Sequence, residues 1–391
     1  MKYNFDTAVD RTENDASKYD ERVKQFGTDQ VIPLWVADMD FKTAQPVLDA
    51  VEAKAKQGIF GYTARRDEYF DSIARWQERR NGWRPDTTLM SFAPGVVPAL
   101  AALVRQFAAE GESVLIQPPV YPEFYEVAEH CGRVVLENRL VEQLDGRFTL
   151  DLADFEEKLK TGPKLFILCN PQNPVGHAWR PEELRAMGEL CLRYQVPVVS
   201  DEIHGDLMLF GNKHTPMASV SGAIAANTIT CTAVSKTFNL AGLQAATVVF
   251  NNQAQREQFE TFWHSLEIHR NNPFSLVASI AAMNGGEEWL EQLISYIEGS
   301  MTYVCGYLER EIPKIKARLP DATYLLWMDC RGLGLDDRAL SRFMVEKAGL
   351  GLNSGNPFDP RLHGFMRMNL ACPRSILKQA LSRLKAAVDA L

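Results

Sequence analysis

The stretch Ser235-Lys236-Thr237-Phe238-Asn239-Leu240-Ala241-Gly242-Leu243-Gln244 decides how the rest of the chain is interpreted. It follows residues 228–234, a run rich in β-branched side chains that predicts a buried strand. Lys236 then lies just past the end of that strand, above the edge of a sheet. A lysine in a dry cleft loses its proton readily and attacks carbonyl groups, as Schiff-base lysines do. A solvated loop lysine is the alternative, so the choice depends on the other segments.

The size and composition of the chain favour two domains and a small-molecule site. With 391 residues and 46% apolar composition, the chain can bury two cores with a cleft between them. A net charge of −8 gives no broad basic surface, so we expect neither nucleic acid nor an anionic membrane as a partner. Seven scattered cysteines without a C-x-x-C pair, and the lack of an apolar signal or membrane-spanning run, predict a reduced cytoplasmic protein.

Strand-like runs alternate with helical runs in the first two thirds of the chain. This alternation predicts an α/β fold with a mostly parallel sheet covered by helices, in which ligands bind beyond the carboxyl ends of the strands. Strands are expected at 113–117, 133–137, 164–168, 196–199 and 228–234, and helices at 46–57, 68–82, 121–130, 152–159 and 181–195. A further helix is expected to begin after Gly95, where free N–H groups could hold a phosphate.

The last third of the chain is mainly helical. Helices are expected at 253–264, 273–283, 287–317 and 337–347, and a final one from Pro373. The segment 364–370 alternates as a strand and places Arg367 opposite its apolar face. Arg367 is therefore either an exposed edge-strand arginine or a bidentate clamp for a carboxylate.

Polar motifs follow two of the predicted strands directly. The turn at 170–176 is stiffened by two prolines and fixes the amide of Asn173, which can donate to a ligand oxygen. Asp201 would be a buried carboxylate in need of a cationic partner, such as a protonated pyridinium nitrogen. A metal site with His204 is the alternative, but the paired histidine spacing of metal motifs is missing, so we expect no metal. Near the N-terminus, Trp35 belongs either to an arm packed on a core or to a substrate-entrance loop.

Eight segments along nearly the whole chain carry a family resemblance: PLWVADMDF, FGY, PGVVPAL, QPPVYPEF, CNPQNPVG, VVSDEIHGD, SKTFNLAGL and RMNLACPRS. In these segments the sequence resembles the fold-type I pyridoxal phosphate enzymes of the class I/II aminotransferase superfamily, and within it the MalY/PatB-type cystathionine β-lyases. The resemblance implies a large cofactor-binding domain at 46–284 and a smaller α/β domain built from 1–45 and 285–391.

The resemblance also implies a role for each of five residues around pyridoxal 5'-phosphate. Lys236 would bond covalently to the cofactor and later move the substrate's Cα proton. Asp201 would pair with the pyridinium nitrogen, and Asn173 would donate to the phenolate oxygen. Tyr121 would stack on the ring. His204 would lie near the ring oxygen. Many aminotransferases have a tyrosine at this position, whereas the lyases resemble this chain there.

The implied phosphate site differs from that of the wider superfamily. The N–H groups of Val96 and Val97 would hold the phosphate together with the hydroxyl of Ser235 or Thr232. Many relatives have an arginine eight residues after the lysine and a serine three residues before it, where this chain has Gln244 and Ala233. Tyr62 is similar to a tyrosine that reaches the phosphate of a neighbouring subunit, which implies a homodimer.

The reaction implied by the resemblance is a β-elimination on an amino-acid substrate. Arg367 would bind the α-carboxylate, and Trp35 and Tyr62 would shape the substrate pocket. L-cystathionine or another cysteine S-conjugate would then yield a thiol, pyruvate and ammonia. Two alternatives remain: an aminotransferase with the same fold, and a regulatory binding protein that uses this fold to contact a partner.

Overall fold

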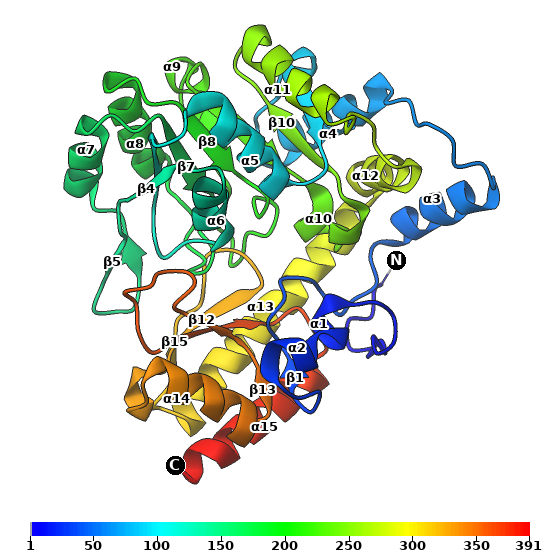
Figure 1. Ribbon diagram of the computed structural model, residues 1–391. Helices are drawn as coiled ribbons and strands as arrows, with labels where there is room; N and C mark the ends of the chain where they lie inside the picture. Colours follow the sequence, from blue (N-terminus) through cyan, green and yellow to red (C-terminus); the bar gives the residue numbers. More distant parts are fainter. Residues whose placement is uncertain (1) are drawn as a thin grey trace.

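A seven-stranded sheet with helices on both faces forms the larger part of the molecule (Figure 1). The structure is a computed structural model that describes residues 2–391. The strands, in spatial order, are β2 (Met90–Ala93), β10 (Ala246–Val249), β9 (Thr228–Thr232), β8 (Val198–Asp201), β7 (Leu165–Cys169), β3 (Ser113–Ile116) and β4 (Val134–Glu137). The five strands from β9 to β4 run parallel, and β10 is antiparallel to both of its neighbours. The predicted α/β fold with a mostly parallel sheet is confirmed.

Alternating side chains along each strand build a core on either face of this sheet. In β3, Val114 and Ile116 point to one face and Leu115 points to the other, and Ile167 and Phe166 divide in the same way in β7. The first face is covered by α5 (Val96–Phe107), α6 (Glu123–His130) and α11 (Gln253–Ser265). The second face is covered by α7 (Leu152–Lys160), α8 (Pro181–Arg193) and α9 (Gly222–Ala225). Because helices cover both faces of the sheet, ligands can enter only at the ends of the strands, beyond their carboxyl termini.

A smaller four-stranded sheet carries the C-terminal part of the chain. Its strands, in spatial order, are β11 (Lys316–Ala317), β12 (Leu325–Asp329), β15 (Phe365–Asn369) and β14 (Asn353–Ser354), all antiparallel to their neighbours. Beside it lie the long α13 (Glu287–Glu311), α14 (Asp337–Arg342), the π-helix η5 (Phe343–Lys347) and α15 (Arg374–Asp389). In Figure 1, α13 runs diagonally between the larger sheet and this C-terminal part.

The N-terminal segment lies against the C-terminal part, although the two are far apart in sequence (Figure 1). The strand β1 (Ile32–Pro33) pairs in parallel with β13 (Leu350–Gly351). The segment also contains α1 (Ser17–Asp20) and α2 (Arg22–Phe26), and it leads to α3 (Gln45–Lys56) and α4 (Asp67–Asn81). The remaining elements are β5 (Val141–Glu142), β6 (Phe148–Thr149), α10 (Val234–Thr237), α12 (Pro273–Gly285) and the 3-10 turns η1 (Thr87–Leu89), η2 (Met217–Ser219), η3 (Ala241–Leu243) and η4 (Arg331–Leu333).

Two predicted elements end earlier than the sequence pattern indicates. The strand predicted at 228–234 ends at Thr232, and Lys236 lies on the short helix α10, where the Phe238 N–H donates to the Val234 carbonyl at 2.9 Å. The helix predicted at 287–317 ends at Glu311, because Pro313 disfavours helical backbone at the residue before it. Two strands of the large sheet, β2 and β10, were not predicted; each is only four residues long, and β10 follows β9 without a long helix between them.

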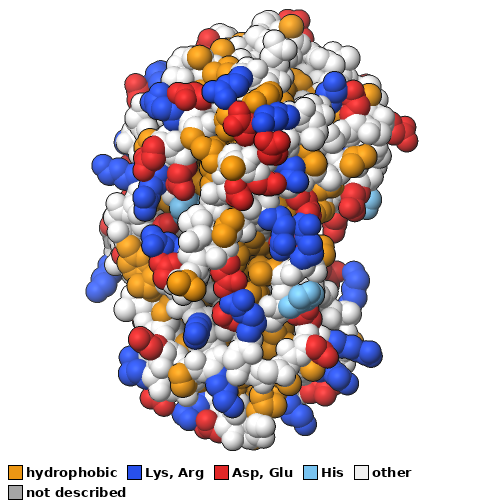
Figure 2. All heavy atoms as spheres, turned by 90° about the vertical axis from the view of Figure 1, so that its left-hand side faces the viewer, with side chains coloured by type: hydrophobic (Ala, Val, Ile, Leu, Met, Phe, Trp, Pro, Cys, Tyr) orange, Lys and Arg blue, Asp and Glu red, His pale blue; other side chains and the backbone are white. Residues whose placement is uncertain are grey.

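The surface in one view is mixed in charge. Figure 2 shows Lys, Arg, Asp and Glu side chains interspersed over this face, without a large area of one sign. Among residues 2–391, no helix is both long enough and apolar enough to span a lipid bilayer.

Candidate active site

Three neighbouring parallel strands bring the predicted polar residues to one edge of the large sheet. The strands β7, β8 and β9 end in register, with Cys169 opposite Asp201 and Asp201 opposite Cys231. Asn173 follows β7, Asp201 is the last residue of β8, and Lys236 follows β9 by one helical turn. The structure therefore places these three residues at the same edge, as the strand pattern predicts.

Lys236 is a partly buried amine held by a backbone oxygen. Its Nζ donates to the Ala37 carbonyl at 2.7 Å, and the Tyr324 hydroxyl donates to the same carbonyl at 2.9 Å. Burial, helped by the positive charge of Arg367, lowers the pKa of Lys236 to about 8. With this pKa, about a tenth of the lysine is neutral at pH 7, and the neutral form is the one that acts as a nucleophile or a base.

Asp201 is a buried carboxyl group that forms no ion pair with residues 2–391, although the charge of Lys236 acts on it. It is 5% exposed, and its Oδ1 accepts one hydrogen bond, from the Ile203 N–H at 3.1 Å. Burial, with a further contribution from the charge of Glu202, raises its pKa to about 7. Among residues 2–391, no ion pair neutralises it. A bound cation, such as a protonated ring nitrogen, would satisfy this group, so the residue fits the predicted cofactor.

Glu202 lies next to Asp201 but is fully paired. Its Oε1 accepts hydrogen bonds from the Ser200 hydroxyl at 2.8 Å and the Met217 N–H at 2.9 Å, and its Oε2 lies 3.0 Å from Nε2 of His214. These contacts hold a second carboxylate behind Asp201. Because like charges repel, Glu202 increases the need of Asp201 for a positive partner.

His204 is a buried histidine in the same cluster. It is 3% exposed, its Nδ1 has no partner among residues 2–391, and its ring packs edge-on against Tyr324 with centroids 6.4 Å apart. Burial, together with the charges of Lys236 and Arg367, lowers its pKa to about 3. The ring is therefore neutral. No group of three or more potential metal-ligating side chains occurs in the part of the chain that the structure describes.

Arg367 is buried beside Asn173, not exposed on an edge. The strand β15 that carries it lies between β12 and β14, and the side chain is 4% exposed. Its Nη1 donates to Asn173 Oδ1 at 3.1 Å, and its guanidinium lies 4.7 Å from the centre of the Phe358 ring. Burial lowers the pKa of Arg367 to about 10. Of the two interpretations of Arg367, the edge-strand one is wrong, because β14 covers the strand.

The N-terminal segment 35–41 both packs on the core and lines the site. Phe41 packs edge-on against Phe5 with ring centroids 5.1 Å apart, and Trp35 is partly buried against Phe26 at 5.6 Å. Backbone oxygens of the segment point to the site: that of Ala37 accepts from Lys236, and that of Trp35 accepts from Arg367. The packing of Phe41 agrees with the interpretation as an arm packed on a core, and the substrate-entrance loop with Trp35 stays a prediction.

An ion network fixes this segment in place. Lys18 is completely buried, and its Nζ lies 3.0 Å from Asp40 and 3.6 Å from Asp38. Arg11 bonds to both aspartates at 2.7 Å. Since Ala37 directly precedes Asp38, the network holds the backbone carbonyl that contacts Lys236.

The residues predicted to hold a phosphate lie around the start of α5 and the end of β9. Val96 is buried and Val97 is partly buried in the first turn of α5, whose N–H groups have no helical acceptor. Thr232 is 7% exposed at the end of β9, and Ser235 is partly buried on α10. The helix α5 packs against β9, and Val96 and Ala233 belong to the same core cluster, so Thr232 lies on a strand that contacts this helix and Ser235 follows it by three residues.

Tyr62 lies apart from the other predicted residues within the chain. It is 95% exposed, and the guanidinium of Arg270 lies 5.2 Å from its ring centre. Tyr62 belongs to the segment 57–66 between α3 and α4, which loops outward at the side of the molecule in Figure 1. The apolar neighbours Ile59 and Phe60 are 77% and 56% exposed.

Sequence reasoning missed several groups that face the site. Tyr324 directly precedes β12, Asn353 lies on β14, and the contact from Ala37 is a backbone carbonyl, so none of them belongs to a recognisable pattern. Glu123, two residues after Tyr121, has a buried Oε2 without a partner among residues 2–391, and burial raises its pKa. The charge of Glu123 acts on both Lys236 and Arg367. The one sequence signal for Glu123 was its position in the QPPVYPEF segment, which carries part of the family resemblance.

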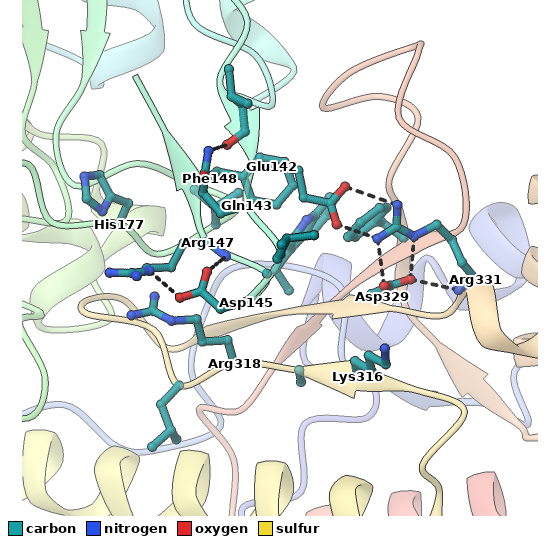
Figure 3. Close-up of a pocket in the computed structure, with 18 residues that line it drawn as sticks. Glu142, Gln143, Asp145, Arg147, Phe148, His177, Lys316, Arg318, Asp329 and Arg331 are labelled. Atoms are coloured by element: carbon teal, nitrogen blue, oxygen red, sulfur yellow. Dashed lines mark hydrogen bonds and ion pairs between the residues drawn. The ribbon is translucent and has the colours of Figure 1, made fainter. Parts of the chain in front are cut away.

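A cavity of about 620 Å³ elsewhere in the protein is a different feature (Figure 3). It lies between the β5–β6 hairpin and the strands β11 and β12, and it contains none of the predicted site residues. Its acidic side chains are already paired: Asp145 with Arg147, and both Glu142 and Asp329 with Arg331. We therefore place the candidate active site at the strand ends and not in this cavity.

Comparison with known proteins identifies the family. A model of the aminotransferase class I and II family matches residues 29–384. The chain belongs to this family. It is 42% identical to cystathionine β-lyase PatB of Bacillus subtilis over 99% of this chain and 100% of that protein. It is 32% identical to protein MalY of Escherichia coli over the full length of both chains.

A solved structure agrees in fold along the whole chain. The crystal structure of cystalysin from Treponema denticola, which contains a pyridoxal 5'-phosphate cofactor, superposes with a TM-score of 0.96 at 32% identity and covers 100% of both chains. The family resemblance and the fold-type I architecture inferred from the sequence are confirmed.

Proposed function

We propose that this protein is a pyridoxal-phosphate-dependent carbon–sulfur β-lyase that acts on L-cystathionine or a related cysteine S-conjugate. The observation that carries the proposal is the meeting of three groups at the strand ends of the large sheet: a lysine with a lowered pKa, a buried carboxyl group without an ion pair, and a buried arginine that reaches in from the small sheet to contact Asn173. The relationship to PatB, a cystathionine β-lyase, over the full chain supports the same reaction.

The residues at the sheet edge fit the cofactor's chemical groups. Asp201 offers a carboxylate to the ring nitrogen, Asn173 an amide to the ring oxygen, and Tyr121 a partly buried ring for stacking. The first-turn N–H groups of α5, with the hydroxyl of Thr232 or Ser235, would hold the phosphate. When bound, pyridoxal phosphate supplies an electron sink for the charge that develops at Cα.

Lys236 would act as the base that removes the substrate's Cα proton. Its pKa of about 8 allows the amine to accept a proton and to release it again near neutral pH. The Ala37 carbonyl, 2.7 Å from Nζ, holds the amine on the side of the site that the N-terminal segment closes. His204 remains neutral in this surrounding and so adds no positive charge next to Lys236.

Arg367 would bind the substrate's α-carboxylate. Its guanidinium is buried and unpaired by any carboxylate of residues 2–391, and its Nε–H has no acceptor there. A carboxylate that enters the site would gain charge-assisted hydrogen bonds in a region with little water. Trp35 lies partly buried next to this arginine and would help to shape the pocket.

We further propose a homodimer in which the segment 57–66 reaches the neighbouring site. Ile59, Phe60 and Tyr62 are neighbours in one loop, and each would stay more than half exposed to water if the chain were a monomer. Covering this area with a second copy would bury it, and Tyr62 would then reach the phosphate site of the partner subunit. The division into a domain at 46–284 and a domain from 1–45 and 285–391, and a cytoplasmic location, remain predictions.

A product assay tests the reaction. The purified protein with pyridoxal phosphate is incubated with L-cystathionine, and pyruvate, ammonia and free thiol are measured together. We expect equal amounts of the three products, and none from Lys236→Ala, whereas the exposed-lysine control Lys213→Ala should behave as wild type. Keto acid that forms only when an amino-group acceptor is added would identify an aminotransferase instead. No product and no cofactor binding would leave the regulatory binding protein.

A mixing experiment tests the dimer. If Tyr62 serves the partner's site, Tyr62→Ala and Lys236→Ala should each be impaired, and mixing them should restore activity. The heterodimer then contains one site with Lys236 from one chain and Tyr62 from the other. Mixing without any gain would show that both residues act within a single chain.

A further inference from the structure

The Arg367 guanidinium is held entirely by oxygen atoms without formal charge. Nη1 donates to Asn173 Oδ1 at 3.1 Å, and Nη2 donates to the Trp35 carbonyl at 3.1 Å and to Asn353 Oδ1 at 2.8 Å. These three contacts use three of the five N–H groups of the guanidinium. The Nε–H has no partner among residues 2–391.

Asn353 makes the shortest of these contacts, and its position follows from the small sheet. The strands β14 and β15 pair in antiparallel register, with Asn353 directly opposite Arg367. Directly opposed side chains lie on the same face of a sheet, so the amide meets the guanidinium without a long reach. Phe358 lies against the guanidinium at 4.7 Å, so the group is fixed by its face as well as by its N–H groups.

We propose that Asn353 is a positioning residue that orients Arg367 and preserves its charge for the carboxylate of the amino-acid substrate. This inference rests on the proposed function of the site. An amide oxygen accepts a hydrogen bond from Nη2 but leaves the positive charge uncompensated. An aspartate in its place would form an internal ion pair of nearly the same geometry, and it would compete with the substrate for the same charge.

The test compares two variants that separate charge from contact. Asn353→Asp keeps the shape and adds a carboxylate, whereas Asn353→Ser removes the contact and stays neutral. We expect Asn353→Ser to raise KM for L-cystathionine about two- to fivefold and Asn353→Asp to raise it about tenfold or more, each with kcat within about twofold of wild type. The control Asn252→Asp adds the same charge at the N-cap of α11, where aspartate caps as well as asparagine, and should leave KM unchanged.

Two probes report on Arg367 without the complete reaction. Propionate carries a carboxylate but no amine, so its affinity, measured by calorimetry on the holoenzyme, should fall in Asn353→Asp by the same factor as KM rises. S-methylcysteamine carries an amine but no carboxylate. Its effect on the visible spectrum of the bound cofactor should be unchanged in both variants, because it makes no use of Arg367.

The KM values and the binding of the two probes decide whether Asn353 acts through Arg367. The proposal is overturned if Asn353→Asp and Asn353→Ser raise KM equally, or if S-methylcysteamine binding is lost along with propionate binding, since either result indicates general disruption. If Asn353→Asp does not fold, an unchanged KM in Asn353→Ser refutes the role. If the wild-type protein forms no pyruvate, the proposed function fails, and the propionate affinities still test Asn353.

Discussion

The carboxyl group of Asp201 should destabilise the cofactor-free protein as pH rises. Its pKa rises from 3.8 to about 7 on folding, mainly because of burial. Below pH 3.8 the group is protonated in both folded and unfolded states and has no effect. Above this pH the unfolded chain releases the proton more readily, so stability falls until about pH 7, where the full loss is about 4 kcal/mol.

Asp201→Asn removes this pH dependence, because the amide does not ionise. The buried amide lacks an acceptor for its N–H groups, which lowers stability by about 1–3 kcal/mol at every pH. The useful quantity is therefore the change with pH. Relative to wild type, the unfolding free energy of cofactor-free Asp201→Asn should improve by about 2–3 kcal/mol between pH 5 and pH 8.

Urea unfolding at a fixed protein concentration measures this difference. The control Asp49→Asn changes an exposed aspartate on α3 and should show the same pH dependence as wild type. With pyridoxal phosphate bound, the charge of Asp201 should stabilise the protein, because the ring cation compensates it. Asp201→Asn should therefore bind the cofactor at least about tenfold more weakly than wild type. A stability difference that stays constant from pH 5 to pH 8 would refute the argument that Asp201 lies uncompensated in the free protein.

Three further substitutions test other parts of the structure. Lys18→Met leaves Asp40 short of one buried partner and should lower the unfolding free energy by about 3 kcal/mol in urea titrations; a change below about 0.5 kcal/mol would contradict the ion network. Gly286→Ala places a methyl group against an aromatic ring and a helix carbonyl and should cost about 2 kcal/mol, whereas Gly242→Ala meets no atom within 4 Å and should cost much less. Arg367→Lys loses the planar fork and should raise KM for L-cystathionine by about 100-fold while the visible spectrum of the bound cofactor persists; an unchanged KM would place the carboxylate elsewhere.

Local sequence patterns determined the fold class and half of the site. The alternation of strand-like and helical runs predicted the α/β sheet, because parallel strands require helical crossovers. The residues Asn173, Asp201 and Lys236 could be singled out for the same reason. Each follows its own strand within a few positions, and parallel strands bring their carboxyl ends to a common edge.

Strand order, which no local pattern records, decided the rest. The alternation at 364–370 could not tell an exposed Arg367 from a buried one, because that depends on whether β14 lies beside β15. The contacts from Ala37, Tyr324 and Asn353 come from segments distant in sequence and include a backbone carbonyl, which carries no side-chain signal. The sequence alone therefore identified the groups that react, and the packing of the N-terminal segment and the small sheet determined how those groups are oriented and charged.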